Sequence, residues 1–293
     1  MEEVVLTVIK VENLTYAYNT DLPVKKDAIE NISFTAEKGE IIGIIGHTGS
    51  GKSTLVQHLN GLIRPSNGKI FYCGKDIWDN PKAIKDIRSK IGLVFQYPEY
   101  QLFDETVFKD VSFGPKNMGL SDEQIKDAVL TATRSVGVSE IYLERSPFDL
   151  SGGEKRRVAI AGVLAMKPKV IAFDEPTAGL DPEGRRTVMQ IIKNYRDENN
   201  ATVFVVSHSM EDIALLADKV LVLNMGKVVM FDTPKKIFSR RAELESIGLA
   251  VPQITRIIHG LIEKGFDLPK DIITVEEAVK AVSSLKKGGE NYD

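Results

Sequence analysis

This sequence has little cysteine, no excess of positive charge and no long apolar run. Cys73 is the only cysteine among its 293 residues, so an internal disulfide is excluded and a reducing compartment fits. The formal net charge is −3, which gives no general attraction to a polyanion. We therefore expect no nucleic acid among its partners.

The apolar residues are spread through the chain and form no membrane anchor. No stretch reaches the roughly 18 uninterrupted apolar residues that a spanning helix needs. The N-terminal segment, MEEVVLTVIK, is acidic where a signal peptide would be basic, and it lacks a long apolar core. We expect a soluble, cytoplasmic protein of one or two domains that reaches a membrane only through partners.

The most informative segment is a glycine-rich run between a predicted strand and a predicted helix. Its glycines allow backbone N–H groups to turn toward a phosphate chain. We expect Lys52 to reach the β- and γ-phosphates and Ser53 to bind Mg²⁺ through its hydroxyl. The alternative is an ordinary glycine turn, and His47 and Thr48 are expected to contribute backbone only. The predicted ATP-binding residues here are Gly46, His47, Thr48, Gly49, Ser50, Gly51, Lys52, Ser53 and Thr54.

Two carboxylates follow a second apolar run, at residues 170–173. Ligands in open α/β sheets bind at the carboxyl ends of strands, so Asp174 is placed to orient Mg²⁺. Glu175 is placed to accept a proton from an attacking water or to orient that water. The alternative for this pair is a simple polar strand end.

A third motif precedes these carboxylates in the chain. Ser151 and two glycines that open a helix would form a second anion-binding site. The motif consists of Leu150, Ser151, Gly152, Gly153 and Glu154. It is close to the LSGGQ signature, with Glu in place of Gln, and the chain therefore resembles the ATP-binding subunits of ABC transporters. The resemblance implies that this motif acts on ATP held by a partner subunit, in a head-to-tail dimer that sandwiches two ATP molecules.

Other positions that match this family follow in order along the chain. By resemblance, Gln96 is a ligand of Mg²⁺ or water that also senses the membrane partner. Asp181 lies in the D-loop, which crosses the dimer interface, and His208 is the switch histidine that contacts the γ-phosphate. Tyr18 matches the aromatic residue that stacks on adenine, whereas Tyr16 is expected to pack in the core.

Two further stretches, 96–103 and 248–255, resemble the ATPases of energy-coupling factor transporters, which are similar to cobalt/nickel-type ATPases. Residues 102–106 look more like the second of the two ATPase types in that group. The resemblance implies a second ATPase subunit, identical or similar to this chain, and a transmembrane coupling protein. It also implies a small membrane protein that captures a vitamin or metal ion, with residues 96–99 near the groove that receives coupling helices. The ATPase would then lie peripherally on the cytoplasmic face of the membrane.

The expected fold class is α/β, a P-loop ABC-type ATPase with a mixed sheet core and an antiparallel β subdomain. Residues 1–231 would form the ATPase domain, with a helical signature insert at about 97–166, and 232–293 a small helical C-terminal domain. Residues 4–18 suggest an edge strand, and 69–77 and 220–230 suggest hairpins. Ser121 and Thr274 each begin a predicted capping box.

Three alternatives remain at the level of function. A non-transport ABC protein would usually carry two cassettes or long coiled-coil insertions, and this chain has neither. A degenerate regulatory ATPase is disfavoured because Lys52, Glu175 and His208 are all present. The third alternative is an ATPase of another ABC importer or exporter, and co-purified partners would separate it from the coupling-factor group.

Overall fold

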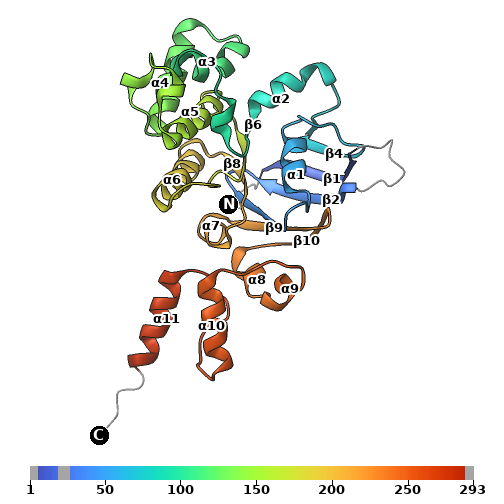
Figure 1. Cartoon of the computed structure of the whole chain (residues 1–293). Coiled ribbons are helices and arrows are strands. Elements are labelled where there is room, and N and C mark those ends of the chain that lie inside the picture. Colours follow the sequence, from blue (N-terminus) through green and yellow to red (C-terminus); the bar gives the residue numbers. More distant parts are fainter. Residues whose placement is uncertain (1–5, 19–26, 288–293) are drawn as a thin grey trace, which may run out of the picture.

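The computed structural model describes residues 6–18 and 27–287, which form two sheets flanked by helices (Figure 1). The smaller sheet is antiparallel and has the strand order β2-β1-β4-β5. Its strands are β1 (Thr7–Ala17), β2 (Asp27–Glu37), β4 (Asn67–Tyr72) and β5 (Lys75–Asp76). The prediction of an edge strand at 4–18 is wrong, because β1 pairs with β2 on one side and β4 on the other. The hairpin expected at 69–77 is formed by β4 and β5.

The larger sheet is mixed and has the order β10-β9-β3-β8-β7-β6. Its strands are β3 (Ile41–Ile45), β6 (Ile91–Val94), β7 (Val170–Asp174), β8 (Thr202–Val206), β9 (Lys219–Asn224) and β10 (Lys227–Asp232). Neighbouring strands from β9 to β6 pair in parallel, and β10 pairs antiparallel with β9 in the hairpin expected there. Every residue of β3, β6, β7 and β8 is buried, as strands covered on both faces require. The carboxyl ends of these strands therefore meet at one edge.

Helix α1 (Lys52–Leu59) lies between the two sheets and joins them into one core. Leu55, Val56 and Leu59 are fully buried among residues of both sheets. On the other face of the larger sheet lie α6 (Pro182–Asn199) and α7 (Met210–Leu216), which contact β8 and β3 respectively. This sandwich holds the end of β3 rigidly against the start of α1.

The helical insert expected at about 97–166 contains three packed α-helices, α3 (Val107–Asn117), α4 (Asp122–Ser135) and α5 (Gly152–Leu164). The capping box predicted at Ser121 is present, with Gln124 as its second member. Helix α2 (Ile84–Lys90) was not predicted, because it is short and has no buried residue to impose a helical pattern. Short 3₁₀ helices occupy Pro81–Ala83, Pro98–Gln101, Glu140–Tyr142 and Pro147–Asp149.

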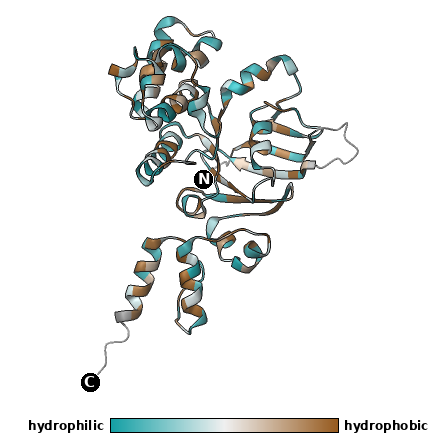
Figure 2. Cartoon of the chain, in the orientation of Figure 1, coloured by the Kyte–Doolittle hydropathy of each residue, from teal (hydrophilic) through white to brown (hydrophobic). Residues whose placement is uncertain are grey.

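Between the last strand and residue 287, where the described part of the chain ends, lie four helices: α8 (Pro234–Phe238), α9 (Arg241–Ser246), α10 (Gln253–Glu263) and α11 (Val275–Lys287). Hydrophobic and hydrophilic residues alternate around α10 and α11, as in amphipathic helices (Figure 2). Ile258, Leu268, Ile272 and Ala278 form a small cluster of their own. The main core nevertheless extends beyond residue 232, because Phe238 and Val251 are buried in it. The division at 231/232 stays a prediction.

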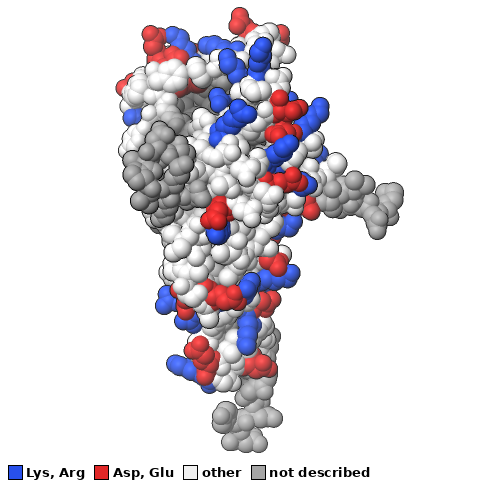
Figure 3. All heavy atoms as spheres, turned by 90° about the vertical axis from the view of Figure 1, so that its right-hand side faces the viewer, with Lys and Arg blue, Asp and Glu red and all other residues white. Residues whose placement is uncertain are grey.

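The second capping box is only half formed. The backbone N–H of Glu277 donates to Thr274 Oγ1 over 3.3 Å, but the Glu277 side chain accepts from the N–H of Ile273. Acidic and basic side chains intermingle on the face seen in Figure 3. Within 6–18 and 27–287, no helix has the length and apolar character to span a bilayer.

Candidate active site

The glycine-rich loop connects β3 to α1, and its conformation explains its glycines. Gly51 has φ of 100°, in the left-handed region that side chains disfavour. A Cβ on Gly51 would lie 2.5 Å from the carbonyl oxygen of Ala28, and one on Gly46 would lie 2.4 Å from that of Leu223. The backbone can therefore take this course only without side chains at these two positions.

The turn between β9 and β10 supports this loop through direct contacts. The N–H of Gly226 donates to the carbonyl of Ser50 over 3.1 Å, and His47 Nε2 lies 3.0 Å from Asn224 Oδ1. The prediction that His47 contributes only backbone did not include this side-chain contact. Nothing in the sequence links residues 47 and 224, because the contact depends on β9 lying beside β3 in the sheet.

Lys52 lies inside the loop and is only 5% exposed. Its Nζ donates to the carbonyls of Gly46 (2.8 Å) and His47 (3.0 Å). Burial lowers the pKa of Lys52, while the nearby carboxylates of Glu175 and Asp174 oppose that shift. The loop thus carries one desolvated ammonium group, which is suited to an anionic ligand.

Asp174 ends β7 with its side chain buried beside Ser53. Burial raises the pKa of Asp174, and the neighbouring Ser53 hydroxyl opposes that shift. Asp174 Oδ1 is buried and finds no hydrogen-bond partner in the described part of the chain. A carboxylate oxygen without a partner next to a hydroxyl fits the oxygen ligands that Mg²⁺ prefers. The described residues contain no group of three or more His, Cys, Asp or Glu that could hold a metal ion.

Glu175 lies between Gln96 and His208, which come from the two strands beside β7. Gln96 Nε2 donates to Glu175 Oε2 over 2.9 Å, and His208 Nε2 lies 2.8 Å from Glu175 Oε1. Glu175 has φ of 49°, and its N–H donates to the carbonyl of Val206. This unusual backbone aims the carboxylate between the ends of β6 and β8. Three residues predicted from separate motifs therefore meet at one point.

Tyr18 lies beside the start of α1, at the end of β1. Its hydroxyl is 3.3 Å from Thr54 Oγ1, and its ring meets the ring of Tyr16 edge-on at 4.9 Å. Tyr18 is 46% exposed, whereas Tyr16 packs on the core around α1, between the two sheets, and on the buried His58 ring. Tyr18 thus presents an aromatic surface to solvent near the loop, and Tyr16 packs inside as expected.

The signature motif forms the start of α5. Leu150 is buried, whereas Ser151 and Gly152 are exposed. Ser151 caps the helix, and Glu154 Oε2 accepts from both its N–H (2.9 Å) and its hydroxyl (2.7 Å). These hydrogen bonds lower the pKa of Glu154. They also show that a Glu at this position completes a capping box with Ser151. Helices α5 and α1 lie apart in Figure 1, so the motif does not cover the glycine-rich loop of its own chain.

Asp181 caps the next long helix, α6. Its Oδ1 accepts from the N–H of Gly184 over 2.8 Å, and the residue is exposed. This hydrogen bond satisfies one of the free N–H groups of the first turn. The predicted contact across a dimer interface needs a second chain and stays a prediction.

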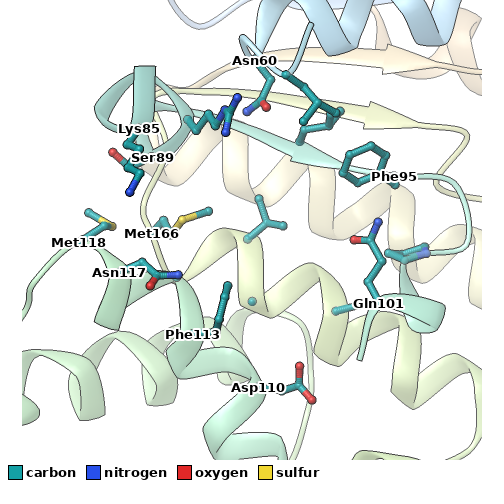
Figure 4. Close-up of a pocket in the computed structure, with 18 of the residues that line it drawn as sticks. Asn60, Lys85, Ser89, Phe95, Gln101, Asp110, Phe113, Asn117, Met118 and Met166 are labelled. Atoms are coloured by element: carbon teal, nitrogen blue, oxygen red, sulfur yellow. The ribbon is translucent and has the colours of Figure 1, made fainter. Parts of the chain in front are cut away.

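A groove of about 860 Å³ lies between α2, α3 and α5 (Figure 4). Pro98 and Gln101, just after Gln96, line one end of it, and the predicted role of the segment 96–99 in receiving a membrane partner stays a prediction. Phe113, on α3, and Met166, just after the end of α5, contribute apolar surface. The groove is therefore lined by residues that closely follow Gln96 in the sequence, and Gln96 belongs to the site around Glu175.

The chain matches known proteins along nearly its whole length. Residues 29–178 match the family model described as ABC transporter. The energy-coupling factor transporter ATP-binding protein EcfA2 of Caldanaerobacter subterraneus subsp. tengcongensis is 52% identical, over 97% of this chain and 99% of the relative. The EcfA2 of Clostridium acetobutylicum is 51% identical, over 94% of this chain and 96% of the relative.

Solved structures agree with these sequence matches. The cbiO1 protein of Clostridium perfringens, part of the ABC transporter complex cbiONQ, is 38% identical with a TM-score of 0.73, covering 87% of this chain and 98% of its own. The ATP-binding cassette MJ0796, a dimer in a post-hydrolysis state with ADP and Pi, is 28% identical with a TM-score of 0.70, covering 77% and 98%. The predicted fold class and family are confirmed: the chain belongs to the ABC transporter ATPases, within the group of energy-coupling factor transporter ATP-binding proteins named EcfA2.

Proposed function

We propose that this chain binds ATP with Mg²⁺ and hydrolyses it to drive a membrane transporter of the energy-coupling factor type. One observation carries the proposal: Glu175 is held between Gln96 and His208, with Asp174 next to it in the chain and beside Ser53. This arrangement combines a general base, two groups that orient it and a magnesium ligand in one place.

The nucleotide would lie along the glycine-rich loop. Its phosphates would meet the backbone N–H groups of the loop and the N-terminus of α1, with Lys52 replacing its present carbonyl partners by β- and γ-phosphate oxygens. The exposed ring of Tyr18 offers a stacking surface for adenine. Ser53, Asp174 and Gln96 would hold Mg²⁺, which when bound neutralises charge on the phosphates.

Hydrolysis needs a water molecule aligned with the γ-phosphate. Glu175 accepts a proton from that water or fixes its direction, and His208 holds the Glu175 carboxylate and contacts the γ-phosphate. Lys52 and the donors of the loop stabilise the charge that develops on the phosphate oxygens. Glu175 and His208 follow the adjacent strands β7 and β8, and Lys52 begins the helix that follows the neighbouring strand β3, so the fold brings these groups to one edge of the sheet.

The second half of each nucleotide site would come from another ATPase chain. The exposed start of α5, with Ser151, Gly152 and the helix N-terminus, offers an anion site that its own loop does not use. In a head-to-tail pair this signature would cover the ATP of the partner, and Asp181 would lie at the interface. The dimeric state of the MJ0796 cassette supports this arrangement.

The membrane partners would be a transmembrane coupling protein and a protein that captures a vitamin or metal ion. The groove beside Pro98 and Gln101 offers an apolar seat of suitable size for a helix of the coupling protein. The chain would then be peripheral, on the cytoplasmic face of the membrane. The names of the EcfA2 relatives support this assignment.

The proposal is tested by comparing ATP hydrolysis and ATP binding in one variant. Glu175→Gln should lower turnover at least 100-fold, an order of magnitude typical of losing a general base, and leave ATP bound. Glu140→Gln, which alters an exposed carboxylate paired with Arg134, is the matched control and should hydrolyse normally. Rapid turnover by Glu175→Gln would remove Glu175 from its proposed role.

A further inference from the structure

Arg156 is a buried charge that none of the sequence motifs explains. It lies in α5, in the turn that follows the signature, and is only 2% exposed. A buried guanidinium is retained only when its N–H groups are satisfied and its charge is paired. Its partners therefore indicate what it holds in place.

The guanidinium joins two segments that are far apart in the chain. Its Nε and Nη2 donate to the two carboxylate oxygens of Glu99 over 2.9 and 2.6 Å, a bidentate pair. Its Nη1 donates to the carbonyls of Ala178 (2.6 Å) and Pro176 (3.3 Å). The ring of Tyr97 lies beside the charge, with its centroid 5.6 Å from Arg156 Cζ.

Both segments begin at residues of the hydrolytic site. Glu99 comes three residues after Gln96, and Pro176 comes directly after Glu175. The side chains of Gln96 and Glu175 meet over 2.9 Å on the open side of these segments. Arg156 connects the same two segments on the buried side, so it sets their separation even when the hydrogen bond between Gln96 and Glu175 breaks.

We infer that Arg156 is a positioning residue for ATP hydrolysis, an inference that rests on the proposed function. Its bidentate contact with Glu99 and its contacts with Pro176 and Ala178 hold Glu175 in register with Gln96. They also fix both segments to α5, which begins directly after its N-cap Ser151. Because Pro98 and Gln101 line the groove, a partner seated there would act on Glu175 through this ion pair.

The geometry predicts a specific functional signature. Neither Arg156 nor Glu99 contacts the glycine-rich loop, so loosening their contact should leave ATP affinity unchanged. It should shift Glu175 relative to the attacking water, and displacements of that kind lower turnover by roughly 10- to 100-fold. Lys cannot replace Arg here, because an ammonium group does not make the bidentate contact and reach a second segment at once.

The test compares Arg156→Lys and Glu99→Gln with wild type, using the complete transporter complex purified through a tag on this chain. We expect both variants to lower kcat about 10-fold or more at unchanged KM for ATP, and the double variant to lose little beyond either single one. Arg134→Lys is the matched control, since its ion pair with Glu140 is exposed and remote from the site. Thermal unfolding of each variant identifies any that fails to fold, and Glu99→Gln keeps the test decisive if Arg156→Lys does.

Two outcomes would overturn the inference: folded variants with wild-type kcat, or equal losses in kcat and in ATP affinity. Wild-type and Glu175→Gln complexes assayed in parallel separate this result from a failure of the proposed function. A wild-type complex without ATPase activity, or an active Glu175→Gln complex, would contradict the proposed function itself. Normal turnover by both Arg156→Lys and Glu99→Gln, with Glu175→Gln inactive, would contradict only the role of Arg156.

Discussion

The surroundings of Asp174 disfavour the charged form of its carboxyl group. The carboxyl group is buried and Oδ1 has no partner among the described residues, so ionising it costs free energy. Its pKa is consequently raised above 3.8, the ordinary value for aspartate. A bound divalent cation favours the charged form and would reverse that shift.

The raised pKa predicts opposite effects of pH on stability and on magnesium binding. As the pH rises through the pKa of Asp174, the apo protein should lose stability, because the folded state disfavours the charged form. Magnesium-dependent ATP binding should instead weaken as the pH falls through the same pKa. Asp174→Asn should abolish both trends and lower Mg²⁺-dependent affinity at neutral pH about 10-fold or more.

Calorimetric titration with ATP at fixed Mg²⁺, together with thermal unfolding, measures both trends over a range of pH. Wild type and Asp174→Asn are titrated with the same nucleotide, so protonation of ATP itself cancels from the comparison. A variant that keeps the wild-type pH dependence of Mg²⁺-dependent binding would exclude Asp174 as the titrating ligand.

Much of the site could be predicted from single motifs, because backbone phosphate binding and strand-end carboxylates require particular residues at fixed spacing. Contacts between motifs could not be predicted. The bond between Gln96 and Glu175 and the support of His47 by Asn224 both depend on strand order. Arg156 gave no signal at all, because an arginine after a helix start is usually solvated.

At the scale of elements, one residue at the start of α5 would combine two functions. Ser151 is the N-cap of the helix and also the residue proposed to face the ATP of a partner. Helix α4 offers an internal comparison, since Ser121 and Gln124 form the same kind of capping box without any proposed ligand. Substitutions at the two caps can therefore separate stability from function.

Ser151→Ala and Ser121→Ala should each lower the free energy of unfolding by about 1 kcal/mol, the usual value for a lost N-cap. Only Ser151→Ala should reduce ATP hydrolysis, and ATP affinity of the isolated chain should not change. Denaturant unfolding and steady-state ATPase assays of both variants check this prediction. Equal losses of activity in the two variants would mean that Ser151 acts only as a cap.

The prediction of an edge strand at 4–18 failed because strand pairing depends on distant parts of the chain. Alternation along β1 reports that one face is buried, but it does not report how many strands pair with its edges. Strand β1 pairs with β4 although β3 and α1 separate the two strands in the sequence. Sequence periodicity has no access to such long-range neighbours.

At the scale of the molecule, the C-terminal helices belong to two packing units. Helices α8 and α9 complete the main core with side chains that are at most 1% exposed, namely Ile237, Phe238 and Leu244. Helices α10 and α11 enclose the small cluster around Ile258. A hydrogen bond links the start of α10 to α7: the backbone N–H of Gln253 donates to the Glu211 carboxylate over 3.1 Å.

Truncations at two points should therefore have different results. Removing 232–293 exposes the partners of three large side chains, each worth about 2 kcal/mol, and this loss rivals the whole stability of a typical domain. Removing 252–293 leaves those three side chains in place. In thermal unfolding, we expect the protein with the shorter deletion to be folded and the one with the longer deletion to be unfolded or aggregated. Two equally stable proteins would support 231/232 as the domain boundary.

In the proposed mechanism, two chains bind each ATP from opposite sides and separate after its hydrolysis. The most direct measurement is the mass in solution of the Glu175→Gln chain, alone and mixed with the companion ATPase of its complex, in the presence of ATP and Mg²⁺. ATP should produce a dimer that ADP does not, and Ser151→Arg should abolish that dimer while ATP remains bound. ATP bound to a chain that stays monomeric in both mixtures would contradict the account, as would loss of ATP from the isolated Ser151→Arg chain.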